Sequence, residues 1–317
     1  MQATMASEPQ TVPQTMRVHV LMNLKSGRGS EKPQIQDLED TFAAHGITAE
    51  IIRLKPKDDI SARAAQLARE GAELIIAAGG DGTICGVASG LVGTDAAMGV
   101  IPLGTFNYFG RSLNIPETAA EAIAVIAANR RKTIPVGVIN DRVFLNNTSL
   151  GIYPQILRTR ETVYERWGRS RIAAYWSVLK TMMRLPRRLK LKITVDGDTR
   201  EVKTSLLFAV SNAFQLEQMG LEGIKCIEQG KLAVLIAPNR GRLGLLKNGL
   251  ALMLGRAQRD HDFELLCADR MHITCKRKSL LVARDGERTR ISGPFELEMR
   301  QGALTVLTPD GEDGGIR

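Results

Sequence analysis

The chain has 317 residues, of which 44% are hydrophobic and 24% are charged, a composition that excludes an intrinsically disordered protein and is sufficient for two domains. The net charge is +9, and residues 158–192 account for all of it, because they contain eleven Lys and Arg against two Asp and Glu. No apolar run is long enough to span a membrane, and the first fifteen residues do not have the pattern of a secretory signal. The charge distribution predicts a local basic patch that faces an anionic partner.

The first half of the chain alternates apolar strand patterns with amphipathic helix patterns. Strands are predicted over 17–23, 48–54, 73–78 and 98–101, and helices over 33–45, 59–70, 83–91 and within 105–129. Strands that are separated by helices pair in parallel through right-handed crossovers. This half is therefore predicted to be a doubly wound α/β domain, and such sheets bind ligands at the carboxyl ends of their strands.

From about residue 139 the pattern changes to consecutive strands. They are predicted over 143–152, 189–202, 204–212, 231–238, 272–292 and 303–309. Several of them join at Asp-Gly pairs, which favour tight hairpins. We expect a second, mostly antiparallel β domain, interrupted by helical stretches over 160–185 and 241–255.

The four cysteines are Cys85, Cys226, Cys267 and Cys275, and they show neither a C-x-x-C pair nor the spacing of metal ligands. The four histidines are scattered and add no such pattern. The cysteines are therefore predicted to be free thiols in a reducing compartment.

A glycine-rich turn follows the third predicted strand. The apolar run that ends at Ala78 leads into Gly79 and Gly80, which let the backbone approach a ligand, and Thr83 opens an amphipathic helix. A helix N-terminus that follows such a turn is suited to bind phosphate. The alternative is an ordinary strand–turn–helix corner, and the generic pattern does not decide between the two.

Two further loops repeat this pattern at the ends of neighbouring strands. Gly104 and Thr105 follow the strand over 98–101, and residues 23–29 (NLKSGRG) follow the first strand. Because parallel strands end at one edge of their sheet, the three loops are predicted to converge on one ligand. Three short connections without a shared ligand remain the alternative.

The motifs NLKSGRG (23–29), GGDGT (79–83) and IPLGTFNYFGRSLNIP (101–116), in this order, resemble the diacylglycerol kinase catalytic family, which includes bacterial lipid kinases, sphingosine kinases and ceramide kinases. The stretches NNTSLGI (146–152) and ARDGE (283–287) extend the resemblance to roughly residues 17–309. GGDGT alone is shared with NAD kinases and phosphofructokinases, whereas its combination with the third motif is more specific to lipid kinases. The resemblance implies a nucleotide-binding α/β domain and a β-sandwich domain, with the last strand returning to the first domain.

The resemblance also implies roles for individual residues. Those expected around the nucleotide are Asn23, Ser26, Gly27, Gly80, Asp81, Gly82, Thr83, Gly104, Thr105 and Asn107, to which the turn itself adds Gly79. Asp81, Asp285 and Glu287 are the expected catalytic residues, and Glu287 matches the proposed proton acceptor of the family. Asp81 is suited to be a ligand of Mg²⁺ or of water, or part of the base system. For the Asp285–Glu287 turn, a plain hairpin is the alternative, since Asp196-Gly197-Asp198 has the same composition.

The chain departs from the family at several positions that are usually acidic or polar. After GGDGT, the family's phosphate loop usually continues with Asn-Glu, where this chain has Cys85 and Gly86, and its second loop usually has an aspartate where Tyr108 stands. Gln229 and Ala233 stand at the acidic structural magnesium site of bacterial members, so we do not expect that site here. ATP with catalytic Mg²⁺ remains the expected cofactor pair.

Residues 160–188 combine aromatic and basic side chains at helical spacing. The candidates for contact with a membrane surface are Trp167, Arg169, Arg171, Trp176, Lys180, Arg184, Arg187 and Arg188. Such a helix suits an anionic membrane, which a lipid kinase must reach. A helix that packs into the core and exposes a basic face is the alternative. Nucleic acid is not expected, because no binding motif accompanies the charge.

The sequence as a whole predicts an ATP- and Mg²⁺-dependent kinase for a primary hydroxyl of a diacylglycerol-like or sphingoid lipid. The predicted domains are an ATP-binding domain over 16–138 with a returning strand over 302–309, and a lipid-substrate domain over 139–301, with tails over 1–15 and 310–317. A cytoplasmic protein, peripheral at the inner face of the membrane, is expected, and a homodimer is left open. The alternatives are a kinase for a soluble acceptor such as NAD and a relative that binds nucleotide or lipid without turnover.

Overall fold

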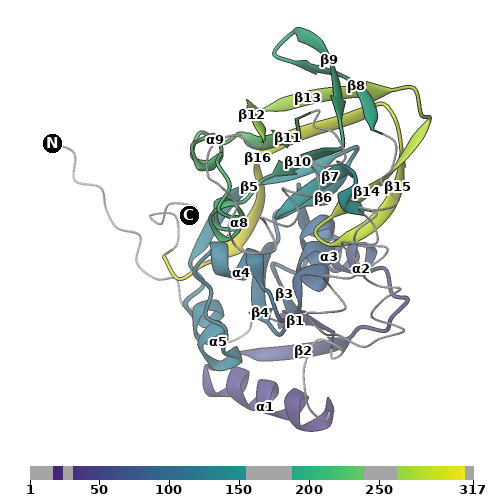
Figure 1. Cartoon of the computed structure of the whole chain (residues 1–317). Coiled ribbons are helices and arrows are strands. Elements are labelled where there is room, and N and C mark those ends of the chain that lie inside the picture. Colours follow the sequence, from purple (N-terminus) through teal and green to yellow (C-terminus); the bar gives the residue numbers. More distant parts are fainter. Residues whose placement is uncertain (1–16, 24–30, 155–187, 239–262, 311–317) are drawn as a thin grey trace, which may run out of the picture. The chain divides into compact units, whose positions relative to one another are not determined.

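The computed structural model describes residues 17–23, 31–154, 188–238 and 263–310. The chain forms two compact units (Figure 1). Unit 1 comprises Met1–Pro135 and Gln301–Arg317, and unit 2 comprises Val136–Arg300. The predicted helical stretches over 160–185 and 241–255 lie outside the described residues.

Unit 1 contains a parallel sheet. Its strands, in spatial order, are β2 (Thr48–Arg53), β1 (Arg17–Met22), β3 (Leu74–Gly79), β4 (Ala97–Pro102) and the last residues of β16 (Phe295–Leu307). β3 and β4 are buried at every position, as continuous apolar runs in a parallel sheet should be. β16 adds to β4 in parallel through Thr305 and Val306, and this is the predicted returning strand.

The helices of unit 1 pack in two pairs on the sheet (Figure 1). They are α1 (Glu31–Ala44) with α5 (Ala119–Ala128), and α2 (Ile60–Arg69) with α3 (Asp81–Leu91); a short α4 (Tyr108–Ser112) follows β4. α2 begins where the carboxylate of Asp59 accepts a hydrogen bond from Ala62 N, 3.0 Å away. α3 lies close to α2 because Gly90 has no side chain: a Cβ atom there would be 2.3 Å from the carbonyl oxygen of Ser61.

Unit 2 contains two antiparallel arrangements of strands. One sheet has the order β12 (Glu264–Ala268), β11 (Leu232–Ile236), β10 (Leu206–Val210), β7 (Asn147–Gly151), β14 (Ser279–Arg284) and β15 (Glu287–Ser292). The other joins the first residues of β16 to β13 (Arg270–Cys275), β8 (Leu189–Val195) and β9 (Asp198–Thr204), while β5 (Arg131–Ile139) pairs with β16 and with β6 (Arg142–Phe144). The predicted fold class, a parallel-sheet domain followed by an antiparallel domain, is confirmed.

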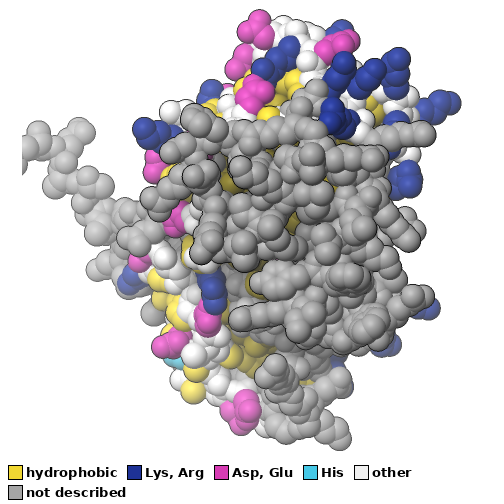
Figure 2. Space-filling model, viewed as in Figure 1, with side chains coloured by type: hydrophobic (Ala, Val, Ile, Leu, Met, Phe, Trp, Pro, Cys, Tyr) yellow, Lys and Arg dark blue, Asp and Glu magenta, His cyan; other side chains and the backbone are white. Residues whose placement is uncertain are grey.

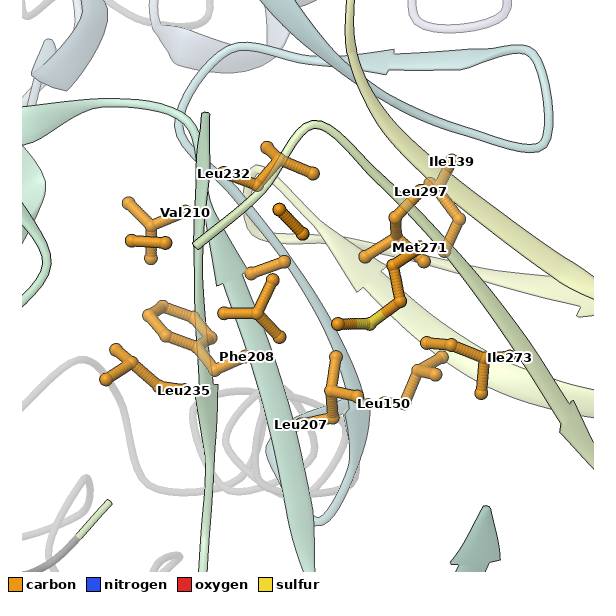
Figure 3. Packing of buried hydrophobic residues seen from close by; sticks show 14 of the residues in the cluster. Ile139, Leu150, Leu207, Phe208, Val210, Leu232, Leu235, Met271, Ile273 and Leu297 are labelled. Carbon is orange, nitrogen blue, oxygen red and sulfur yellow. The ribbon is translucent and has the colours of Figure 1, made fainter. Parts of the chain in front are cut away.

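The core of unit 2 lies between these strands (Figure 3). Leu150 and Leu207 approach it from neighbouring strands of the first sheet, and Met271, Ile273 and Leu297 from the second. All five side chains are almost completely buried. Buried and exposed residues also alternate along β8, since Leu189, Leu191 and Ile193 face the core while the two lysines between them face outward.

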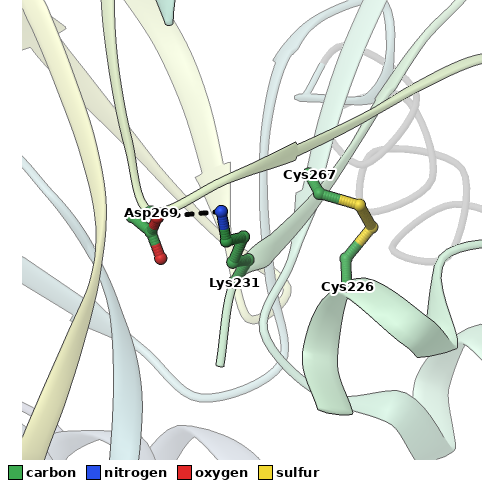
Figure 4. Close-up of a disulfide and its surroundings, with 4 residues drawn as sticks. All are labelled: Cys226, Lys231, Cys267 and Asp269. Carbon is green, nitrogen blue, oxygen red and sulfur yellow. Dashed lines mark ion pairs between the residues drawn. A yellow bond between two sulfur atoms is a disulfide. The ribbon is translucent and has the colours of Figure 1, made fainter. Parts of the chain in front are cut away.

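The prediction of free thiols is wrong for two of the four cysteines. Cys226 in α9 (Ile224–Glu228) and Cys267 in β12 form a disulfide with Cα atoms 5.2 Å apart (Figure 4). Their separation of 41 residues carries no pairing signal, because the folding of β11 against β12 brings them together. The disulfide removes the support that the cysteine pattern gave to a reducing compartment. Cys85 and Cys275 form no disulfide.

Two short helices in unit 2 were not predicted. α8 (Ala213–Met219) begins at Asn212, whose side-chain oxygen accepts a hydrogen bond from Gln215 N, and it ends at Gly220. α9 follows four residues later. Both are too short to show a clear helical period in the sequence. Among the described helices, none is both long and apolar enough to cross a membrane.

Candidate functional site

Three loops of unit 1 follow the carboxyl ends of adjacent parallel strands. β1 ends at Met22, and the next residue, Asn23, donates its backbone N–H to Ala78 O of β3 at 2.9 Å. Leu103, which follows β4, donates to Gly79 O at 2.9 Å. The two neighbours of β3 in the sheet, β1 and β4, are therefore both hydrogen-bonded to its end through the residues that follow them. Of the first loop only Asn23 is described, and the predicted residues Ser26 and Gly27 lie outside the described residues.

The middle loop is a sharp strand-to-helix turn. Gly80 has extended backbone angles and is the N-cap of α3, so that Asp81 is the first helical residue and is half-buried. Thr83 is 3% exposed, and its backbone N–H bonds Gly80 O at 2.9 Å. A Cβ atom on Gly79 would lie 2.6 Å from Thr83 Oγ1, which explains the glycine at this position. Gly82 is exposed at the helix N-terminus, where backbone N–H groups and the helix dipole favour an anion.

The loop after β4 lies directly against this turn. A Cβ atom on Gly104 would be only 2.6 Å from Gly80 Cα, so the two backbones meet at their glycines. Asn107 supports the contact from a left-handed conformation (φ 49°) and donates its side-chain N–H to Gly104 O at 3.1 Å. Its Oδ1 atom is buried and accepts no hydrogen bond from the described residues. Thr105 is exposed beside it. These two loops thus lie against each other, and their convergence on one ligand stays a prediction.

In unit 2, the Asp285–Glu287 turn joins β14 to β15, and its aspartate has a definite structural role. Asp285 Oδ2 accepts a hydrogen bond from Leu145 N at 2.7 Å, and Oδ1 accepts from Asn146 N and Asn147 N at 2.9 Å each. One carboxylate thereby satisfies three consecutive backbone N–H groups that precede and begin β7. Glu287, by contrast, is exposed.

The Asp196–Asp198 hairpin has a similar composition to the Asp285–Glu287 turn and provides an internal comparison. Asp196 and Gly197 connect β8 to β9 with positive φ angles of 52° and 89°, and Asp285 and Gly286 have 45° and 84°. The two turns thus have the same kind of backbone, as Asp-Gly hairpins favour. Asp196 is exposed at its tip, whereas Asp285 reaches residues about 140 positions earlier in the chain. Asp285 therefore has distant partners that a plain hairpin does not require, whereas the exposed Glu287 is what a plain hairpin would show, so the catalytic role of this turn stays a prediction.

Comparison with known families bears on the unit that carries the three loops. Residues 17–139 match the diacylglycerol kinase catalytic domain. The predicted resemblance to this family is confirmed. The matched residues contain the middle loop and the loop after β4, together with the strands and helices that position them.

Relatives and solved structures agree with this match. Diacylglycerol kinases of Staphylococcus aureus, including those of strains RF122 and MRSA252, are 28% identical over 196 residues, which is 61% of this chain and 61% of theirs. The alignment thus spans about three fifths of the relatives. A crystal structure of a diacylglycerol kinase from Bacillus anthracis str. Sterne shares the fold, with a TM-score of 0.66, 22% identity and coverage of 92% of this chain and 96% of that one. Another structure from the same strain has a TM-score of 0.70 at the same identity.

Metal ligands and titratable groups are sparse in the described part of the chain. There, no three His, Cys, Asp or Glu side chains gather in a way that could hold a metal ion. Gln229 follows α9 and Ala233 is buried in β11, so neither brings a carboxylate to that part of unit 2.

Burial lowers the pKa of Lys132 in β5, and the carboxylate of Asp310 acts in the opposite direction. Lys132 is not a predicted site residue.

Sequence reasoning missed a network of buried amides in unit 2. Asn147 donates its side-chain N–H to Gln215 Oε1 at 2.9 Å, and Asn212 donates to Asn146 Oδ1 at 3.1 Å. All four side chains are at most 7% exposed. The adjacent asparagines in NNTSLGI were the available signal, because consecutive amides inside a strand pattern require partners. The network connects α8 to the residues that Asp285 holds.

The predicted membrane-facing residues fall mainly in a region that is not described. Trp167, Arg169, Arg171, Trp176, Lys180, Arg184 and Arg187 lie outside the described residues. Arg188, the last of the set, is described and exposed just before β8. The role of this segment stays a prediction.

Proposed function

We propose that the protein is an ATP-dependent lipid kinase that transfers the γ-phosphate to a primary hydroxyl of a diacylglycerol-like or sphingoid lipid. The observation that supports this most is the contact between Gly80 and Gly104, within residues that match a diacylglycerol kinase catalytic domain. Two glycine loops that meet at the carboxyl edge of a parallel sheet form a cradle that an added Cβ atom would fill. Unit 1 is thus proposed to bind ATP, and unit 2 the lipid.

The residues present fit a nucleotide with a divalent cation. Backbone N–H groups at the N-terminus of α3 would hold phosphate oxygens, together with the backbone at Gly104 and Thr105. The buried Asn107 Oδ1 offers an acceptor for a hydroxyl or an amine. Mg²⁺, for which the Asp81 carboxylate is the proposed ligand, would neutralise the charge of the triphosphate.

The transfer requires a proton acceptor and an oriented hydroxyl. In the proposed step, the hydroxyl oxygen of the lipid forms a bond to the γ-phosphorus, the bond to the bridging oxygen breaks, and ADP leaves with that electron pair. The hydroxyl proton goes to a carboxylate, for which Glu287 is proposed because it is exposed and opens β15. Asp285 is proposed to position this turn, since its carboxylate holds three backbone N–H groups.

A lipid acceptor implies contact with a membrane surface. We propose that the protein associates peripherally with the inner face of the membrane, with residues 160–188 as one contact. A role in phospholipid biosynthesis is proposed together with the lipid acceptor, and a homodimer is left open.

The experiment that tests the function is an acceptor panel with labelled ATP and Mg²⁺. The panel contains detergent-dispersed diacylglycerol, a sphingoid base, a total lipid extract and NAD. We expect a phosphorylated lipid and no labelled NAD phosphate. Transfer to NAD alone would favour a soluble-acceptor kinase, because GGDGT is shared with NAD kinases. ATP binding without any transfer would favour a non-catalytic relative.

A further inference from the structure

Lysines face one another at one end of the sheet formed by β9, β8 and β13. Lys190 of β8 and Lys203 of β9 are direct cross-strand partners. On the other side of β8, Cys275 is the last residue of β13 and pairs with Leu191, so Lys276 follows β13 at the end of the sheet where Lys190 lies. All three lysines are exposed. The strands thus place Lys190 opposite Lys203, and Lys276 lies just past the end of β13 at the same end of the sheet.

The turn that follows β13 brings two more positive charges to this end of the sheet. Arg277 and Lys278 are both exposed and lead into β14. We call Lys190, Lys203, Lys276, Arg277 and Lys278 the basic end of the sheet. Within the described residues, none of the five forms an ion pair.

The rest of the same sheet balances its charges. Lys192, two residues after Lys190 on β8, lies directly opposite Glu201 of β9. On β13 and β16, Arg270 forms an ion pair with Glu298 at 3.1 Å, and His272 contacts Glu296. Figure 2 shows Lys and Arg side chains gathered around β8 and the β13–β14 turn, with acidic side chains beside them toward the β8–β9 turn. The uncompensated charge is therefore local to the basic end.

Like charges directly opposite each other on neighbouring strands destabilise a sheet. The chain retains Lys190 opposite Lys203, whereas Lys192 on the same strand lies opposite Glu201. An array of anions lying on this end of the sheet would remove the repulsion and gain attraction from each charge. The arrangement therefore fits a partner with many closely spaced negative charges.

We propose that the basic end of the β9–β8–β13 sheet is a docking surface for anionic phospholipid headgroups. The choice of partner rests on the proposed lipid-kinase function, because the acceptor of such an enzyme lies in a bilayer. Nucleic acid fits less well, since the basic end carries no aromatic side chain on which bases could stack and no helix that could enter a groove. A bilayer requires only a positive surface.

Vesicle binding by the full chain tests this surface directly. The probes are vesicles of phosphatidylcholine alone and of equal parts phosphatidylcholine and phosphatidylserine, and binding is measured by co-sedimentation without ATP. We expect binding only to the anionic vesicles, and a sharp loss as the ionic strength rises from about 0.1 M to about 1 M. Substituting Lys190→Gln, Lys203→Gln and Lys276→Gln together should weaken binding by about 100-fold, or about 5-fold for each lysine.

The same sheet offers a matched control with an equal loss of charge. Arg200→Gln, Arg270→Gln and Arg300→Gln remove three cations that already form ion pairs with Glu264 or Glu298. This variant should bind anionic vesicles far more tightly than the lysine variant does. Equal losses in the two variants, or no loss in the lysine variant, would overturn the proposal. Tighter binding of an oligonucleotide than of vesicles, lost in the lysine variant, would overturn it in favour of nucleic acid.

Two further measurements separate this proposal from misfolding and from failure of the kinase function. The thermal midpoint of the lysine variant should equal or exceed that of the wild type, because the substitutions relieve repulsion between strands. Transfer to detergent-dispersed lipid should be unchanged, since no bilayer is needed there. If the wild type transfers no phosphate at all, the kinase function fails while the vesicle result still decides whether the surface exists.

Discussion

The contact between the two glycine loops of unit 1 is tested by Gly104→Ala. The added Cβ atom would lie 2.6 Å from Gly80 Cα and 2.7 Å from Asn107 Oδ1. Carbon atoms in contact are ordinarily about 3.5–4.0 Å apart, so the loops must separate by about 1 Å. The φ angle of Gly104 is not in the left-handed region, so the effect is one of space alone and not of backbone strain.

We expect Gly104→Ala to weaken ATP binding by about 5-fold to about 150-fold, which corresponds to the about 1–3 kcal/mol that overpacking typically costs. The neighbour in the clash is backbone and cannot rotate away as a flexible side chain could. The assay is isothermal titration calorimetry with ATP and Mg²⁺, accompanied by thermal unfolding. A weaker affinity with a largely retained thermal midpoint would locate the damage in the loops.

Gly110→Ala is the control on the same segment. Gly110 lies in α4, and the nearest atom to an added Cβ is Pro102 Cβ at 3.8 Å, an ordinary contact. Its affinity for ATP should equal that of the wild type. The reasoning is refuted if Gly104→Ala binds ATP as tightly as the wild type, or if both substitutions weaken binding to the same extent.

Three further outcomes are expected. Asp285→Asn should lower the free energy of unfolding by about 1–3 kcal/mol in urea, because an amide cannot accept from all three N–H groups, whereas exposed Asp196→Asn should change little; equal effects would contradict this. Reducing the Cys226–Cys267 disulfide should cost about 4 kcal/mol for its separation of 41 residues, and urea curves that coincide with and without reductant would argue against it. Asp81→Ala should abolish phosphate transfer while the fold is retained, as judged by circular dichroism; retained transfer would exclude its role.

The loops of unit 1 were predictable because their signals are local. Buried apolar runs such as Leu74–Gly79 identify parallel strands, and glycines at the strand ends mark where backbones approach. The Asp-Gly pairs likewise identified the β8–β9 and β14–β15 hairpins before the structure was known. In each case a few neighbouring residues determine the conformation, so a single sequence is sufficient.

The contacts that sequence reasoning missed join residues that are distant along the chain. Asp285 bonds the backbone of residues 145–147, and Cys226 bonds Cys267 across 41 residues. The local sequence does not indicate which of the two Asp-Gly aspartates will bind distant backbone groups, because this depends on how β7 and β14 pair. The family motif singled out Asp285 as a catalytic residue; its three hydrogen bonds show that it holds the backbone of residues 145–147, and the catalytic role stays a prediction.

β16 is the last strand of the described chain, and it joins the sheet of unit 1 only after the other strands of that sheet have been synthesised. β16 supplies the parallel partner of β4 through Thr305 and Val306, and Gly93 N bonds Ala303 O beside it. During synthesis, β1 to β4 leave the ribosome well before β16, so this edge of β4 stays unpaired until residues 303–307 have been made. Unpaired strand edges promote association between chains. A nascent or truncated chain that ends before residue 303 should therefore depend on chaperones to remain soluble.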